Sequence, residues 1–194
     1  MRELSEIERA DFTLMPTEID CATFVSQKKE EFTVLCSQKQ IRFRSTFQDM
    51  RRDSKPMRLD AHRINRILDN VFANSVRFTP EHGVIAWSTR VMEGKVEFEF
   101  IDSGPGFSEQ DLRQMFQRFY QGDPSRSAEK GHAGLGLSIA QTLVQKHGGN
   151  IRTGNVPGGV ERPSACGYGN WSDAGAFGEG KSEHTYVLVP PFRI

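Results

Sequence analysis

The chain has 194 residues, of which 37% are hydrophobic and 26% are charged. This mixture is typical of a soluble globular domain with its own core, and it excludes a disordered chain. Lys and Arg together number 25, as do Asp and Glu, so the formal net charge is zero. Because proteins that bind nucleic acid through its phosphates usually carry a basic excess, we expect no nucleic-acid partner.

Neither the cysteines nor the apolar runs indicate an oxidised or membrane-spanning chain. The three cysteines, Cys21, Cys36 and Cys166, form no C-x-x-C pair, which argues against a disulfide framework and a zinc site. No apolar run approaches the roughly 18–20 residues of a membrane span, and the N-terminus lacks a signal-peptide core. We therefore expect a cytoplasmic domain, whether or not its parent protein is longer and anchored in the cell membrane.

The first half of the chain predicts two helices and two strands. Residues 1–16 are charged and turn-like towards Pro16. Residues 17–40 then carry apolar side chains near helical spacing, and residues 41–47 alternate as a half-buried strand does. A short return strand is expected at 57–59. The clearest helix follows Asp60, a plausible N-cap. Its apolar stripe consists of Ile64, Ile67, Leu68, Val71, Phe72 and Ser75.

The second half predicts a hairpin, two helices and two final strands. Residues 84–91 and 96–101 form the hairpin, with Glu97 and Glu99 on a face directed away from the core. A turn at 102–106, a helix at 108–120 and a mobile loop at 121–133 follow. A helix at 135–147 ends at a glycine pair, and strands are expected at 151–156 and 186–189. The glycine-rich stretch 157–183 predicts no packed element and is expected to be a flexible loop.

This order of elements predicts the fold class. It is α+β, a two-layer α/β sandwich with helices on one face of a mixed, mostly antiparallel sheet.

Three groups of residues, called constellations below, have the chemistry of a binding site. Asn70, Asn74 and Arg77 share one helix sector with Arg63 and Arg66, opposite the apolar stripe. An Asn oxygen is a suitable ligand for Mg²⁺ and Arg pairs with phosphate, although a solvated helix face is the alternative.

The second constellation is Asp102-x-Gly104-x-Gly106, directly after the second hairpin strand. Glycines let backbone approach a flat ligand, and a carboxylate can accept a hydrogen bond from an amino group such as that of adenine. The alternative is an ordinary turn. The third constellation is the run 131–137, GHAGLGL, which opens a helix, and free N–H groups at such a start bind phosphate. It is neither a Walker P-loop nor a dinucleotide fingerprint, and the alternative is a plain helix start.

The three constellations together resemble one family. Residues 67–80, ILDNVFANSVRFTP, resemble the N box of sensor histidine kinases, whose usual form is x-L-x-N-L-x-x-N-A-x-K-Y-T-P. DSGPG at 102–106 is similar to the first glycine box of that family, and GHAGLGL at 131–137 is similar to the second. Phe116, Phe119 and Tyr120 match the F box. The resemblance covers nearly the whole chain, about residues 3–156 together with the last strand, and four motifs in the right order and at the right separations make it specific.

The resemblance implies an ATP-binding catalytic domain with a defined set of contacts. Asn74 would bind Mg²⁺, Asp102 would recognise the adenine amino group, and Arg126 would reach the γ-phosphate. Residues from about 107 to 133 would form an ATP lid anchored by the F box, and Thr185 would approach the base. The implied ATP-binding residues are Asn70, Asn74, Arg77, Phe78, Asp102, Gly104, Gly106, Phe119, Tyr120, Arg126, Gly131, Gly134, Leu135, Gly136, Leu137 and Thr185.

Four positions depart from the family pattern. Arg77 stands where Lys is usual, and Phe78 stands where Tyr is usual. In the lid, Gln121 replaces a frequent Arg and His132 replaces a frequent Gly. Because the metal ligand and the adenine carboxylate remain, we expect ATP binding to be retained.

The resemblance also selects a branch and implies partners. ATP-hydrolysing relatives carry a basic Glu four residues before the metal-binding Asn, where this chain has Asn70, whose amide cannot take a proton. This favours a protein-histidine kinase, which phosphorylates a histidine. None of the five histidines has the family's phosphoacceptor context, whereas residues 4–10, LSEIERA, resemble the end of its dimerisation helix.

We therefore expect residues 1–16 to be the end of that helix with a linker, and residues 17–194 to be the catalytic domain. The expected partners are a separate dimerisation domain carrying the histidine and a response-regulator receiver domain. Alone the fragment would be largely monomeric, and its parent a homodimer. The alternative is a degenerate nucleotide-binding module without phosphotransfer.

Overall fold

The computed structural model describes residues 2–122, 134–156 and 182–189. Its helices are α1 (Arg2–Ile7), α2 (Cys21–Gln38), α3 (Ala61–Phe78), α4 (Glu109–Gln114) and α5 (Gly136–Lys146). Its strands are β1 (Thr17–Ile19), β2 (Arg42–Asp49), β3 (Met57–Leu59), β4 (Val84–Met92), β5 (Lys95–Asp102), β6 (Asn150–Val156) and β7 (Ser182–Val189). No helix in these ranges is long and apolar enough to cross a membrane.

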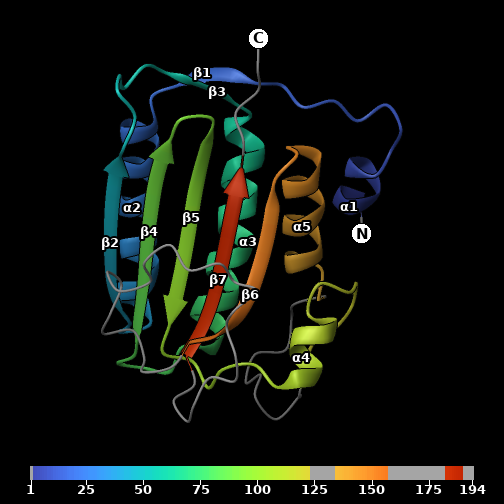
Figure 1. The fold of residues 1–194 in the computed structure, drawn as a ribbon. Helices are drawn as coiled ribbons and strands as arrows, with labels where there is room; N and C mark the ends of the chain where they lie inside the picture. Colours follow the sequence, from blue (N-terminus) through green and yellow to red (C-terminus); the bar gives the residue numbers. More distant parts are fainter. Residues whose placement is uncertain (1, 123–133, 157–181, 190–194) are drawn as a thin grey trace.

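The main sheet has five strands in the order β2-β4-β5-β7-β6. Only β2 and β4 run parallel, and the other three neighbouring pairs are antiparallel. Figure 1 shows α2, α3 and α5 side by side behind this sheet, while α4 lies at the end where β5 finishes. The predicted two-layer sandwich with a mixed, mostly antiparallel sheet is therefore confirmed. The short strands β1 and β3 form a second, two-stranded sheet at the opposite end (Figure 1).

The core lies between the sheet and the helices and contains a cluster of aromatic rings. Phe32 of α2 stacks on Phe72 of α3 with ring centroids 3.7 Å apart, and Trp87 of β4 stacks on Phe100 of β5 at 5.9 Å. All four side chains are buried. Rings of this size remove a large apolar area from water, so this cluster fixes how the two long helices sit on the sheet.

Helix α3 agrees closely with its predicted pattern. All six members of the predicted apolar stripe are buried, and the Asp60 side chain accepts a hydrogen bond from the Arg63 amide as an N-cap. Thr79 follows the last helical residue in an extended conformation, as expected one residue before Pro80. The stripe holds one face of α3 against the sheet, so its opposite, polar sector is fixed as well.

The N-terminal segment packs on the domain. Leu4 and Ile7 of α1 are buried in the same apolar cluster as the core of α5. The Phe12 ring has the Arg63 guanidinium 5.1 Å from its centroid and the Lys146 ammonium at 5.6 Å. These contacts hold residues 4–12 against α3 and α5.

Two predicted helix boundaries were wrong. The helix expected to begin at residue 17 begins at Cys21, because residues 17–19 pair with β3 and Asp20 is the N-cap. The helix expected over 108–120 ends at Gln114, and Ser108 is its N-cap. The helix expected over 135–147 is confirmed: α5 spans Gly136–Lys146 between the cap residues Leu135 and His147, and the expected glycine stop follows at Gly148, which has a positive φ angle.

The prediction of one buried hairpin face was also wrong. Glu97 and Glu99 of β5 are 7% and 5% exposed, although the alternation places them opposite the aromatic core. Arg90 of β4 lies 3.3 Å from the Glu97 carboxylate, and the Ser88 hydroxyl donates to Glu99. Such partners make the burial of carboxylates tolerable. On α2, likewise, the Lys28 side chain is buried, whereas Leu35, one of the apolar side chains near helical spacing that the sequence places in the expected helix, is exposed.

The remaining differences concern the last strands. The strand expected at 186–189 begins at Ser182, so the last two residues of the stretch 157–183 belong to β7. Residues 157–181, which carry the rest of that expected loop, lie outside the described residues, as does most of the expected loop at 121–133.

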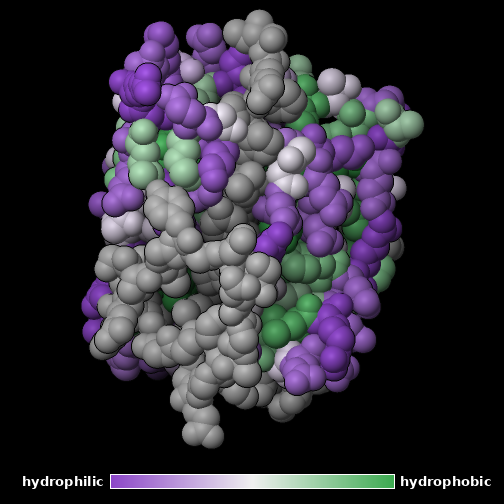
Figure 2. All heavy atoms as spheres, viewed as in Figure 1, coloured by the Kyte–Doolittle hydropathy of each residue, from purple (hydrophilic) through white to green (hydrophobic). Residues whose placement is uncertain are grey.

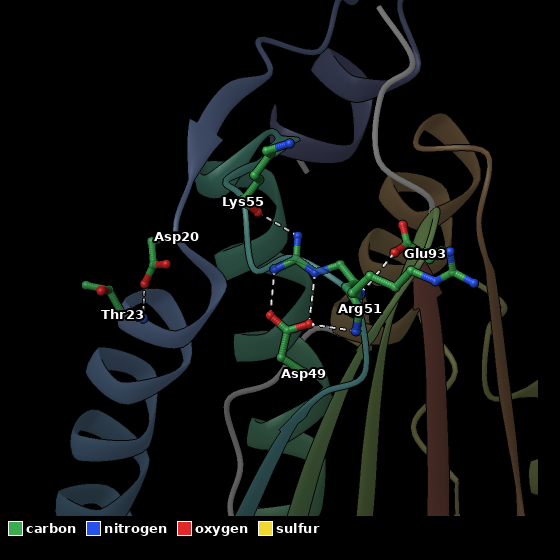
Figure 3. Close-up of polar contacts among 7 residues, drawn as sticks. Asp20, Thr23, Asp49, Arg51, Lys55 and Glu93 are labelled. Atoms are coloured by element: carbon green, nitrogen blue, oxygen red, sulfur yellow. Dashed lines mark hydrogen bonds and ion pairs between the residues drawn. The ribbon is translucent and has the colours of Figure 1, made fainter.

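A polar cluster closes the connection from β2 to β3, at the end of the sheet away from α4. The Arg51 guanidinium donates to both Asp49 oxygens at 2.9 and 2.6 Å and to the Lys55 carbonyl at 2.6 Å (Figure 3). These bonds hold the pKa of Asp49 at about 2, mainly because a guanidinium stabilises the carboxylate. The cluster is structural and lies away from the site described next.

Candidate functional site

A pocket opens at the α4 end of the sheet. It lies among the last turns of α3, the turn after β5, α4 and the first turn of α5. Figure 2 shows hydrophobic atoms exposed at the level where Figure 1 places α4, bordered by hydrophilic residues. The residues that line the pocket are Asn74, Arg77, Phe78, Pro105, Gly106, Phe107, Asp111, Met115, Tyr120, Gln121, Gly122 and Leu137.

Helix α3 contributes one wall of the pocket with its polar sector. Asn74, Arg77 and Phe78 are all half-buried and line the pocket together. The Arg77 guanidinium lies 5.2 Å from the centroid of the Phe78 ring. Its Nε is buried and has no hydrogen-bond partner among the described residues. A buried N–H without a partner is costly, so this group calls for an acceptor such as a phosphate oxygen.

Asn70 lies one turn earlier on α3 and does not line the pocket. Its Nδ2 donates to the Arg66 carbonyl at 2.9 Å, which turns Oδ1 towards the start of α5. A Cβ atom placed on Gly136 would lie only 3.2 Å from that oxygen. Asn70 therefore borders the glycine at which α5 begins, and the two helices approach closely there because Gly136 has no side chain.

Asp102 is the last residue of β5 and is 2% exposed. Its carboxylate accepts hydrogen bonds from the Gly104 amide at 2.9 Å and from the Ser75 hydroxyl of α3. Burial nevertheless raises the pKa of Asp102 to about 7, because two hydrogen bonds do not compensate for the lost water. Asp102 is the residue at which the turn to Gly106 begins, and Gly106 is a pocket residue with a φ angle of +75°.

The chain after α4 forms the opposite wall. The Tyr120 hydroxyl donates to Asp111 Oδ1 at 2.8 Å, and the Phe119 amide donates to the Gly134 carbonyl at 3.0 Å. Gly134 has a φ angle of +64°, and a Cβ atom there would lie 2.6 Å from the Tyr120 carbonyl oxygen. The chain at Gly134 can therefore lie this close to Tyr120 only because residue 134 is glycine.

Helix α5 begins beside this wall. Its N-cap position is Leu135, whose side chain makes no capping hydrogen bond. The N-cap side chain therefore does not occupy the amide groups at the start of α5, which can serve as donors for an anion. Leu135 is buried in the core, and Leu137 lines the pocket.

Some predicted site residues lie apart from the pocket or outside the described residues. The Phe119 side chain is 58% exposed and does not line the pocket. Arg126 and Gly131 lie outside the described residues. For Thr185 only the backbone is described, and it pairs with Phe100, two residues before Asp102 on β5.

Half of the pocket wall consists of residues that the sequence did not single out as ATP-binding, although five of these six fall within the expected lid at 107–133. Asp111 lies in α4 and Met115 is its C-cap residue, and Pro105, Phe107, Gln121 and Gly122 come from the segments that flank it. One signal was present in the sequence, because Ser108-x-x-Asp111 has the spacing of a capping box, which the structure forms. That spacing predicts a helix start but gives no sign that Asp111 also faces a pocket.

The arrangement suits a nucleotide with its phosphates. Arg77, whose Nε has no partner within residues 2–122, 134–156 and 182–189, and the Asn74 amide share the pocket with the aromatic rings of Phe78 and Tyr120. Asp102 lies behind the adjoining glycine turn. Apolar walls with a few placed polar groups are typical of small-molecule sites.

Comparison with known proteins agrees with this assignment. Residues 59–169 match the family profile described as histidine kinase-, DNA gyrase B-, and HSP90-like ATPase. Over 103 residues the chain is 37% identical to the sensor histidine kinase WalK of Bacillus subtilis. This match covers 52% of this chain and 17% of WalK. Over 160 residues it is 28% identical to the sensor-like histidine kinase SenX3 of Mycobacterium tuberculosis, covering 80% of this chain and 37% of SenX3. The chain thus spans well under half of these curated relatives.

Solved structures show the same fold. Full-length ShkA in complex with AMPPNP aligns with a TM-score of 0.72 at 22% identity, covering 99% of this chain and 34% of ShkA. The catalytic domain of the histidine kinase ThkA aligns with a TM-score of 0.64 at 21% identity, covering 91% of this chain and 96% of that domain. The chain belongs to the family of histidine kinase-, DNA gyrase B- and HSP90-like ATPases, as an ATP-binding catalytic domain of the sensor histidine kinase type.

Proposed function

We propose that this domain binds Mg·ATP in the α3–α4 pocket and transfers the γ-phosphoryl group to a histidine on a separate dimerisation domain. The observation that carries the proposal is the buried Arg77 Nε, which has no partner in the described part of the chain and lies in a pocket that also holds Asn74. Phosphoryl transfer needs charge neutralisation and positioning more than covalent chemistry from the protein, and these side chains supply both.

Each side chain then has a separate task. Asp102 would accept a hydrogen bond from the adenine amino group, and Arg77 would donate to the phosphates. Phe78 and Tyr120 would pack beside the nucleotide. The start of α5, with Gly134 and Gly136, would bring backbone N–H groups to the phosphates.

The donor set also fits a magnesium ion held mainly by the nucleotide. Asn74 would hold it through its side-chain oxygen, and the bound ion would neutralise charge on the phosphates. Asn70 would be a neighbouring polar contact. Because Asn70 donates to the Arg66 carbonyl and an amide cannot take a proton, α3 offers no general base for water attack at that position.

We propose that the domain works in the cytoplasm within a homodimeric parent protein, whether or not that parent is anchored in the cell membrane. Its further partner would be a response-regulator receiver domain, which takes the phosphoryl group from the histidine. Residues 17–194 would form the catalytic domain, and residues 1–16 would connect it to the dimerisation domain.

The test is transfer of label to a histidine in trans. The chain is mixed with γ-labelled ATP, Mg²⁺ and a dimerisation-domain fragment from a sensor histidine kinase, and the label is followed on the fragment. We expect acid-labile, base-stable phosphate on the fragment, and none with the Asn74→Ala variant. Tight nucleotide binding without any phosphohistidine, using a fragment that its own kinase domain can label, would instead favour the degenerate nucleotide-binding module.

A further inference from the structure

Asp111 joins two parts of the pocket wall. It lies in the first turn of α4, and its two carboxylate oxygens have different partners. Oδ2 accepts from the Ser108 amide at 2.8 Å and from the Ser108 hydroxyl at 2.6 Å. Oδ1 accepts from the Tyr120 hydroxyl at 2.8 Å, nine residues further along the chain.

The Oδ2 contacts belong to the cap of α4, whereas the Oδ1 contact lies outside it. With the bond from the Asp111 amide to the Ser108 hydroxyl, the Oδ2 bonds complete a capping box that starts α4. A cap needs one carboxylate oxygen. The second oxygen is directed to Tyr120, and both Asp111 and Tyr120 line the pocket.

The backbone around Tyr120 is shaped to keep this contact. Gly122 has a φ angle of +64°, and a Cβ atom there would lie 3.0 Å from Asp111 Oδ1. Gly134 approaches the Tyr120 carbonyl from the other side. Burial, and then the Asp111 carboxylate, raise the pKa of Tyr120, so its hydroxyl stays protonated and remains a donor at neutral pH.

We propose that Asp111 is a positioning residue for nucleotide binding, which orients the Tyr120 ring as a wall of the pocket. The inference rests on the proposed function, because the ligand that gains from a fixed ring is the nucleotide. It acts through pre-organisation, since a ring already held in place loses less conformational freedom when the ligand binds.

Two variants and their combination test the contact. Asp111→Ala and Tyr120→Phe each remove one half of the hydrogen bond, and binding of a non-hydrolysable ATP analogue with Mg²⁺ is measured by titration calorimetry. We expect each variant to weaken binding by roughly threefold to tenfold, the usual worth of one net hydrogen bond. The double variant should lose no more than about twofold beyond either single variant, because both remove the same contact.

Ser108→Ala is the matched control. It removes both hydroxyl bonds of the cap but leaves the bond from the Ser108 amide to Asp111 and the Tyr120 contact in place. We expect it to lower the thermal midpoint, as Asp111→Ala does, and to bind the analogue within about twofold of wild type. Thermal scans confirm that every variant folds.

Three results would each overturn the inference alone. The first is an equal loss of affinity in Ser108→Ala and Asp111→Ala, which would make the cap the cause. The second is wild-type affinity in Asp111→Ala, and the third is single losses of affinity that multiply in the double variant. A wild-type chain that binds no nucleotide would overturn the proposed function as well.

Discussion

Replacement of Asp102 by Asn would separate the effect of this carboxylate on folding stability from its effect on nucleotide affinity. Asp102 is 2% exposed and accepts hydrogen bonds from Gly104 and Ser75. An Asn side chain has nearly the same shape. Its oxygen can still accept from the Gly104 amide, and its NH₂ can donate to the Ser75 hydroxyl. The substitution therefore removes the charge and leaves the packing in place.

The expected change in stability follows from the pKa of Asp102. Burial raises that pKa from its ordinary value of 3.8 to about 7. Between these values the folded chain binds a proton that the unfolded chain has lost, so the free energy of unfolding falls as pH rises from about 4 to about 7. This shift in the pKa of Asp102 lowers the free energy of unfolding of wild type by at most about 4 kcal/mol above pH 7. The Asn variant has no such loss.

Denaturant unfolding of both proteins at pH 5 and pH 8 measures this difference. Every other titrating group is shared, so the gap between variant and wild type isolates Asp102. We expect the unfolding free energy of the variant, relative to that of wild type, to rise by about 2–3 kcal/mol between pH 5 and pH 8. A gap that does not change with pH would refute the raised pKa.

The nucleotide should reverse the order of stability. With saturating Mg·ATP analogue at pH 8, wild type should gain thermal stability and the Asn variant should gain little, because binding to the folded state alone stabilises it. Wild-type affinity should also fall from pH 8 to pH 6 as Asp102 becomes protonated. Unchanged affinity in the variant would show that Asp102 does not contact the adenine amino group.

Three further substitutions test other parts of the molecule. Gly134→Ala places a Cβ atom 2.6 Å from the Tyr120 carbonyl at a φ angle of +64°; thermal scans and calorimetric titration should show lower stability and weaker nucleotide binding. Arg77→Ala should weaken nucleotide binding at least about tenfold in the same titration. It should change the unfolding free energy by no more than about 1 kcal/mol, because without ligand the buried Arg77 Nε has no partner among the described residues. Unchanged affinity would contradict the phosphate assignment. Arg51→Ala should lower the unfolding free energy by about 1–3 kcal/mol at pH 7. Because Arg51 holds the pKa of Asp49 at about 2, below its ordinary value of 3.8, this loss of unfolding free energy should shrink as pH falls from about 4 to about 2. The substitution should leave nucleotide binding unchanged.

Patterns that depend on one element could be predicted from the sequence. The α3 stripe and the Asp60 cap were correct because helical periodicity and capping are local. The pocket residues of α3 followed from the same helix geometry, since Asn74 and Arg77 share the sector opposite the stripe.

Features that depend on a distant partner could not be predicted in the same way. Glu97 and Glu99 read as exposed positions, and their burial depends on Arg90 and Ser88 of the neighbouring strand. Residues 17–19 read as helix because their pairing with β3 is not a local property. Asp111 has a recognisable capping spacing, but its contact with Tyr120 appears only when the chain after α4 returns to it.

The two walls of the pocket should therefore respond differently to substitution. The α3–β5 wall is continuous with the core, where Phe72 and Phe100 are buried, so its polar groups are held by packing even without ligand. In the wall from α4 to Gly122, α4 itself has no buried residue; Met115 after it is buried, Phe116 packs against the core, and the polar contacts are chiefly those of Asp111. Substitutions in the second wall should thus reduce nucleotide affinity mainly through lost pre-organisation, with small changes in global stability. Hydrogen exchange that slows on nucleotide addition at residues 115–122, but hardly at all in the buried turns of α3, would show this division directly. Equal protection of both walls before nucleotide is added would contradict it.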